Sequence, residues 1–112
     1  MARLLRGDVW WANLGPGLGS EQSGRRPALI LSHEVFNDRS GTVIALMLTS
    51  KRPRLGFPLT LESKALGLSR QSWIKIGQVR TLAVERLGDY IGSAPPEEVV
   101  RAVEGLNEII GR

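Results

Sequence analysis

A glycine-rich polar segment at residues 15–24 separates two short runs that have the composition of β-strands. The first run, residues 8–13, is aromatic and β-branched, and the second, residues 28–32, is almost wholly apolar, which predicts a central strand. Glycines free the backbone of the connecting segment, whereas Pro27 has a fixed φ angle and stiffens the entry to the second strand. Arg25 and Arg26 therefore lie where a polar loop meets a strand. Because guanidinium groups match phosphate geometry, this junction is a candidate anion site.

Further short runs of strand composition follow at close spacing. They lie at residues 42–49, 57–61, 72–76, 78–82 and 86–91, and residues 63–68 are predicted to form one helical turn that Gly67 ends. The run at 42–49 is too continuously apolar to have one face in water. Short strands joined by short loops predict a small curled sheet, a barrel, within a single domain at residues 1–112.

An amphipathic helix is predicted at the end of the chain. Pro95 and Pro96 suit a helix start, and the two glutamates that follow them favour its positive end. Apolar residues then recur at helical spacing from Val99 to Ile110. This stripe must pack on the barrel or on a second subunit, and the latter would make the protein a dimer. The predicted fold class is mainly β with one α-helix that closes the barrel.

Composition excludes several kinds of chemistry. The 112 residues include no cysteine, which excludes disulfides, thiolate zinc sites and thiol nucleophiles and fits a reducing cytoplasm. No segment approaches the roughly 20 apolar residues that cross a bilayer, and no signal peptide is visible. The chain has fifteen lysines and arginines and eleven acidic residues, and basic residues cluster at 25–26 and at 51–54. A basic face of this kind attracts nucleic acid or an acidic protein segment.

The titratable residues also limit the possible mechanisms. His33 is the one histidine, so the chain has no pair of imidazoles for acid and base work and no histidine-rich metal site. Ser32, His33 and Asp38 could be written as a triad, but neighbours in a strand point to opposite faces. Arginine and hydroxyl groups suffice for one reaction, because RNA carries its own nucleophile. The ribose 2′-OH can attack the adjacent phosphorus if the protein aligns it and stabilises the developing charge.

Four sequence blocks then resemble a known family. RGDVWWANL, GSEQSGRRPALIL, ALMLTSK and GQVRTL occur in the order and at the separations seen in the MazF/PemK toxin endoribonucleases. The second block is the most specific, since it contains the loop motif GSEQ-x-G-x-RP without a gap. The resemblance covers about residues 5 to 110. It implies an SH3-like, partly open barrel that acts as a homodimer and cleaves single-stranded RNA at short sequence motifs with no metal or other cofactor.

The resemblance also implies the site residues. Arg26 corresponds to the arginine before the proline of the second block and would stabilise the pentacoordinate phosphorus, while the Thr49 hydroxyl would hold the scissile phosphate in line. The remaining candidate RNA-binding residues come from the first loop, from the basic segment after residue 49 and from the last block: Ser20, Glu21, Gln22, Arg25, Lys51, Arg52 and Gln78. Family toxins are held inactive by a cognate antitoxin whose acidic, disordered segment lies in the RNA groove, and the basic loops here offer such a segment a binding site.

Other interpretations stay open at this point. Toxins of the same fold that poison DNA gyrase use a tryptophan near the C-terminus, where this chain ends with isoleucines, glycine and arginine instead. A barrel that binds RNA without cutting it is the other alternative. Thr49 could be only a β-branched strand residue, and Arg25 a solvated neighbour of Arg26. Of Trp10 and Trp11, strand geometry sends one to the core and one outward, and Trp73 is expected in the core.

Overall fold

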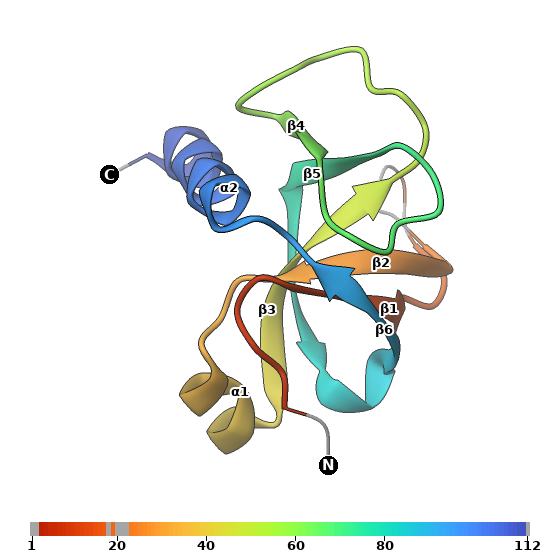
Figure 1. Cartoon of the computed structure of the whole chain (residues 1–112), viewed down its shortest axis with the longest axis vertical. Helices are drawn as coiled ribbons and strands as arrows, with labels where there is room; N and C mark the ends of the chain where they lie inside the picture. The colour runs from red at the N-terminus through yellow and green to blue at the C-terminus, as the bar shows by residue number, and fades with distance from the viewer. Residues whose placement is uncertain (1–2, 18, 20–22, 112) are drawn as a thin grey trace.

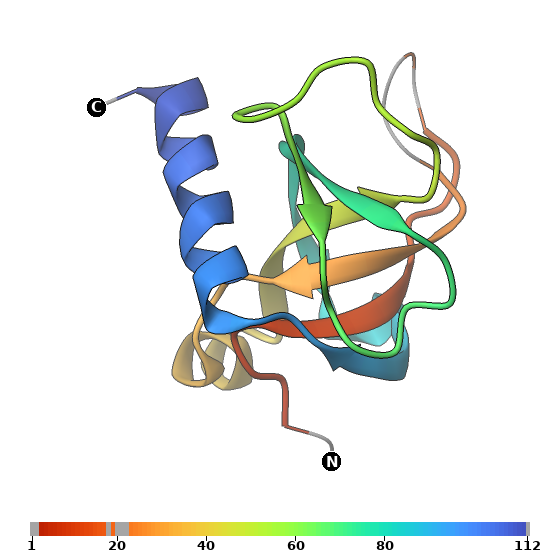
Figure 2. The same cartoon turned by 45° about the horizontal axis from the view of Figure 1, so that its top comes forward.

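One antiparallel sheet of six strands forms most of the molecule, and a C-terminal helix packs against it (Figures 1 and 2). The computed structural model describes residues 3–17, 19 and 23–111. The strands in spatial order are β4 (Thr60–Ser63), β5 (Ser72–Ala83), β3 (Thr42–Thr49), β2 (Arg25–Ile30), β1 (Asp8–Asn13) and β6 (Leu87–Ser93). Two helices, α1 (Glu34–Ser40) and α2 (Pro96–Ile110), and a 3₁₀ turn, η1 (Val84–Arg86), complete the described elements.

The curled sheet stays open between its edge strands β4 and β6, and a loop crosses the gap. The Leu66 N–H donates a hydrogen bond of 3.2 Å to the Ser93 carbonyl, which ties the loop after β4 to the end of β6. Two glycines make this approach possible: a Cβ on Gly67 would lie 2.0 Å from the Ile91 carbonyl oxygen, and one on Gly92 would lie 1.8 Å from that of Leu66. The predicted partly open barrel is confirmed, with its two edges held together by this close contact.

Apolar side chains form a core on each face of the sheet. One core joins buried residues of four strands to α2, among them Val9, Leu29, Leu46, Leu48 and Ile74. Gly105 lets α2 lie close to the sheet, because a Cβ there would come within 2.8 Å of Ile76. The second core is built from residues of β1, β2 and β3 with two leucines, one after β1 and one in β5: Ala12, Leu14, Ala28, Ile30, Val43, Ala45, Met47 and Leu82. A two-sided core of this kind explains why β3 is apolar along its whole length.

The predictions for β1, β3 and α2 are confirmed, while other boundaries were wrong. β2 begins at Arg25, three residues before the predicted strand, because β1 pairs with it as far as Arg25. β4 occupies residues 60–63 rather than 57–61, and the predicted helical turn at 63–68 is a turn centred on 66–67. The strands predicted at 72–76 and 78–82 form one strand, β5, which is interrupted by a bulge. The bulge lies where Leu46 pairs with Val79 but Met47 pairs with Lys75.

Helix α1 was not predicted from the sequence. It follows β2 directly, and buried Asn37 anchors it by donating a hydrogen bond of 2.8 Å to the Leu4 carbonyl. Gly41 ends it in a left-handed conformation with φ 69°. Within the described residues, neither helix has the length and hydropathy needed to span a membrane.

Candidate active site

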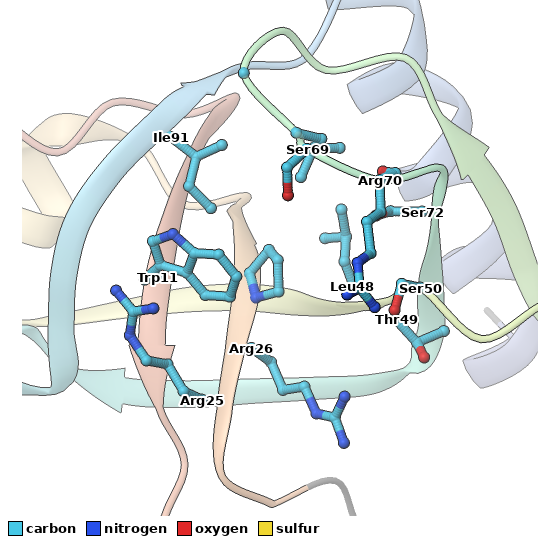
Figure 3. Close-up of a pocket in the computed structure, with 13 residues that line it drawn as sticks. Trp11, Arg25, Arg26, Leu48, Thr49, Ser50, Ser69, Arg70, Ser72 and Ile91 are labelled. Atoms are coloured by element: carbon cyan, nitrogen blue, oxygen red, sulfur yellow. The ribbon is translucent and has the colours of Figure 1, made fainter.

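Arg26 and Thr49 come together because β2 and β3 are hydrogen-bonded neighbours. The antiparallel register pairs Ala28 with Met47 and Leu29 with Leu46. When this register is extended toward the start of β2, it sets Arg26 opposite Thr49. Both residues line one cleft of about 460 Å³, which Figure 3 shows with its surrounding side chains. The sheet therefore brings together two side chains that are 23 positions apart in the sequence.

The stem of the first loop positions Arg26. Beyond the ends of β1 and β2, the Leu14 N–H donates to the Gly24 carbonyl at 2.8 Å and the Gly24 N–H donates to that of Gly15 at 2.9 Å. The half-buried Arg26 then donates from Nε to the Ser23 carbonyl at 3.2 Å. This bond uses one of the five guanidinium N–H donors and leaves the others available to an anion.

Arg25 has different partners from Arg26. Its guanidinium lies 4.3 Å from the centroid of the Trp11 ring, within the range of a cation–π contact, and 3.8 Å from the carboxylate of Asp89. Neighbouring residues of a strand point to opposite faces of a sheet, and Figure 3 shows the two guanidinium groups directed away from each other. The motif arginines therefore have separate environments, with Arg26 on the side of Thr49.

Thr49 ends β3 and is half-buried. Its Oγ1 accepts a hydrogen bond of 3.1 Å from the Lys51 N–H, in the turn that leaves the strand. Since the oxygen is the acceptor in this bond, the hydroxyl proton stays available for donation to a phosphate oxygen. Thr49 therefore offers a hydroxyl donor at the rim of the cleft.

The basic segment after β3 continues the cationic surface. Lys51 and Arg52 are exposed, and the Arg52 guanidinium lies 5.2 Å from the centroid of the Trp73 ring. Trp73 pairs with Thr49 across β3 and β5, so the two side chains share one face of the sheet. Neither Lys51 nor Arg52 lines the cleft itself. They border it beside Thr49, where they add positive charge.

Several predicted residues lie elsewhere. Gln78 is half-buried at the bulge of β5 and does not line the cleft. Ser20, Glu21 and Gln22 fall outside the described residues. The triad of Ser32, His33 and Asp38 is not assembled, because the Ser32 hydroxyl bonds to Asn37 and accepts from the Ile44 N–H at 2.9 Å.

The three tryptophans divide between packing and the cleft. Trp10 packs against the second core and meets Tyr90 edge-to-face at a centroid distance of 5.4 Å. Trp11 lines the cleft beneath Arg25. Trp73 is buried, as expected, although Arg52 lies over its ring. The strand alternation was thus predicted correctly, and the structure identifies Trp11 as the tryptophan that faces the site.

One wall of the cleft was missed entirely in the sequence. It is formed by the loop between β4 and β5 together with Ile91 of β6. The loop contributes Gly67, Leu68, Ser69 and Arg70, and Ser72 follows at the start of β5. These residues come near β2 only when the barrel closes. Their positions in the sequence therefore show no regular spacing relative to the motif blocks.

The charged residues that line the cleft are basic. Among the described residues, the lining includes three arginines and no carboxylate. No group of three or more histidine, cysteine, aspartate or glutamate side chains that could hold a metal occurs among residues 3–17, 19 and 23–111. The arrangement can bind an anion by hydrogen bonds from guanidinium and hydroxyl groups, and it can stabilise charge that develops on phosphoryl oxygens.

The fold and the cleft define a small, half-open β-barrel protein with a cationic site directed at anions. Comparison with known proteins identifies its relatives. The family model described as "PemK-like, MazF-like toxin of type II toxin-antitoxin system" matches residues 5–110. Endoribonuclease EndoA of Bacillus subtilis (strain 168) is 35% identical over 105 residues, which cover 92% of this chain and 90% of the relative.

Solved structures agree with this assignment. MazF (form I) from Deinococcus radiodurans matches with a TM-score of 0.87 and 27% identity over 100% of both chains. An endoribonuclease from a mycobacterial species, solved in complex with its cognate antitoxin, matches with a TM-score of 0.75 and 28% identity over 96% of this chain and 95% of that one. The chain belongs to the MazF/PemK family of toxins from type II toxin-antitoxin systems.

Proposed function

We propose that this toxin is an endoribonuclease that cleaves single-stranded RNA without a metal ion, using Arg26 and Thr49. The observation that carries the proposal is the position of these two side chains at the rim of one cationic cleft, on adjacent strands. The endoribonuclease relative with 35% identity supports the same reaction class. The described lining of the cleft, with three arginines and no carboxylate, favours a polyanion such as RNA over protein contact with gyrase.

In the proposed reaction the ribose 2′-oxygen attacks the adjacent phosphorus as the 2′-OH loses its proton. The bond between phosphorus and the 5′-oxygen then breaks, and the leaving oxygen takes up a proton. The products are a 2′,3′-cyclic phosphate and a 5′-OH end. Arg26 stabilises the negative charge on the phosphoryl oxygens, because its remaining donors are held in place by the bond to Ser23. Thr49 donates its hydroxyl proton to the same phosphate and aligns it with the 2′-oxygen.

The partners follow from the same charge distribution. We propose that a cognate antitoxin inhibits the toxin by placing an acidic, disordered segment in the cleft, and the mycobacterial relative solved with its antitoxin supports such a partner. Arg25, Lys51 and Arg52 would bind RNA phosphates by electrostatic attraction that does not depend on sequence. The same charges would attract the acidic segment of the antitoxin. Ser20, Glu21, Gln22 and Gln78 remain proposed RNA contacts. We propose that the active form is a homodimer. We also propose that it acts in the cytoplasm, because a chain without cysteine forms no disulfide and so does not depend on an oxidising compartment.

Incubation of the purified protein with a long single-stranded RNA in EDTA tests the proposal. The wild type is expected to make discrete cuts that leave 5′-OH ends. The Arg26→Ala variant should make no cuts, although it should unfold within a few degrees of the wild-type temperature. Arg39→Ala is the matched control, because Arg39 is an exposed arginine of α1 that does not line the cleft. Intact RNA with the wild type would refute the proposal, and a DNA supercoiling assay would then test action on gyrase.

A further inference from the structure

The loop between β4 and β5, residues 64–71, is held firmly as the wall of the cleft that faces β2. Its start is fixed by the Leu66 bond to Ser93 and by the close backbone approach at Gly67. Its end is fixed where the Ser72 hydroxyl donates to the Arg70 carbonyl at 2.9 Å and the Gln71 side chain donates to Glu62 at 2.8 Å. The bond between Leu66 and Ser93 spans the gap between the edge strands β4 and β6, and the other two bonds hold the end of the loop to β4 and β5. The loop therefore presents its side chains to the cleft from a fixed position.

Arg70 is the cationic residue of this wall. It is exposed, it lines the cleft, and Figure 3 shows its side chain reaching from the loop toward Thr49 and Ser50. Within the described part of the chain, its guanidinium makes no hydrogen bond or ion pair. Arg26 is bonded to Ser23, and Arg25 lies on Trp11 beside Asp89. Of the three arginines that line the cleft, Arg70 is thus the one whose guanidinium has no partner among the described residues.

The charge of the cleft favours an anion at this position. Three arginines line one cleft, and none of the described residues that line it is a carboxylate. Like charges at close range repel, and the repulsion is relieved when an anion lies between them. Arg25 already has Asp89 at 3.8 Å, so the uncompensated charge is greatest at the end where Arg70 approaches Thr49.

We infer that Arg70 binds an RNA phosphate next to the scissile one, from the wall opposite Arg26. The inference rests on the proposed function and adds a substrate-binding residue to it. With Arg26 on β2 and Arg70 on the facing loop, the RNA backbone is held from two sides while the reacting phosphate stays beside Thr49. A phosphate is favoured over a base edge because nothing in the described structure fixes the plane of the Arg70 guanidinium, as reading of a base would require.

Binding of a non-cleavable RNA tests this assignment. The probe is a fluorescently labelled single-stranded RNA. It carries 2′-deoxyribose at the scissile nucleotide of the mapped cleavage motif, and it is left unmodified if the wild type cuts no RNA. Its Kd is measured by anisotropy at several salt concentrations for the wild type, Arg70→Gln, Arg70→Lys and the control Arg39→Gln. We expect Arg70→Gln to raise Kd about tenfold at low salt and to lower the slope of log K against log salt by about 0.7, the contribution of one phosphate contact. Arg70→Lys should restore the slope.

Cleavage by the same variants separates binding from other roles. For Arg70→Gln we expect KM to rise about tenfold, kcat to change less than about threefold and the cleavage motif to stay the same. A Kd and a salt slope equal to those of Arg39→Gln would overturn the assignment, and so would a changed cleavage motif, which would indicate base reading. If wild-type protein binds the probe with the expected loss in Arg70→Gln but cuts no RNA, the assignment stands and the proposed cleavage fails. Absence of any binding by the wild type would overturn both.

Discussion

Replacement of Gly92 by alanine tests how firmly the cleft wall is attached to the barrel. The added Cβ would lie 1.8 Å from the Leu66 carbonyl oxygen and 2.7 Å from its carbonyl carbon. Both are backbone atoms, so no side chain can rotate to relieve the overlap. The loop must move by more than about 1 Å to reach an ordinary contact distance. Such a movement breaks the hydrogen bond between Leu66 and Ser93, which is 3.2 Å long in the native protein.

The expected cost follows from these two effects. Loss of the hydrogen bond contributes about 1 kcal/mol, and overpacking against backbone adds about 1–3 kcal/mol. The free energy of unfolding should therefore fall by about 2–4 kcal/mol, which for a chain of this size lowers Tm by on the order of 10–20 °C. Displacement of the wall also moves Arg70, so RNA should bind more weakly to the folded variant.

Thermal and urea unfolding, followed by circular dichroism, measure the stability change. Gly88→Ala is the matched control, because Gly88 lies in the same strand β6 and its added Cβ would meet nothing closer than 3.8 Å. The control should unfold within about 0.5 kcal/mol of the wild type. If Gly92→Ala were as stable as Gly88→Ala, the contact would not hold the loop and the reasoning would be refuted.

Three further outcomes are expected. Thr49→Val should slow RNA cleavage about a hundredfold because it removes the hydroxyl donor, whereas Thr49→Ser should stay within about tenfold of the wild type; equal rates for valine and serine would contradict the role of the hydroxyl. His33→Ala should cleave at the wild-type rate because His33 precedes α1 outside the cleft, and loss of activity in a folded variant would show otherwise. The hydrogen bonds from Arg3 lower the pKa of Glu34 below its ordinary value of 4.5. A lowered carboxyl pKa stabilises the fold above the ordinary pKa and loses this effect as pH falls through the lowered value. Glu34→Gln should therefore unfold more readily than the wild type at pH 6, with a difference that shrinks toward pH 3; a pH-independent difference would rule out the ion pair as its cause.

The strongest sequence signals predicted the elements that carry the catalytic candidates. β1 and β3 have continuous strand composition, and Pro95 and Pro96 mark the start of α2, so these elements were predicted correctly. Helix α1 was missed because its seven residues are too few to show a helical period. β5 was divided in two because Gly77 has low strand propensity, yet the bulge at that point lets one strand continue.

The candidate site was predicted in part. Arg26 and Thr49 were assigned through the motif blocks, while their juxtaposition depends on the register between β2 and β3, which no local pattern encodes. Arg70 was missed because its approach to β2 requires the contact between Gly67 and β6, a meeting of segments about 25 positions apart. Long-range closure of this kind leaves no periodic signal in a single sequence. Arg25 was assigned to RNA binding, with a solvated neighbour of Arg26 as the alternative, and its contacts with Trp11 and Asp89 became visible only with the fold.

The pairing of β2 with β3 also sets when the protein can become active. Because Arg26 and Thr49 are carried by these two strands, a slip of one residue in the ladder would turn one of them to the opposite face of the sheet. No partly aligned intermediate keeps both groups in the cleft. During refolding, RNA cleavage should therefore return no earlier than protection of the β2 and β3 amides from hydrogen exchange. The return of activity then reports the time at which these two strands pair.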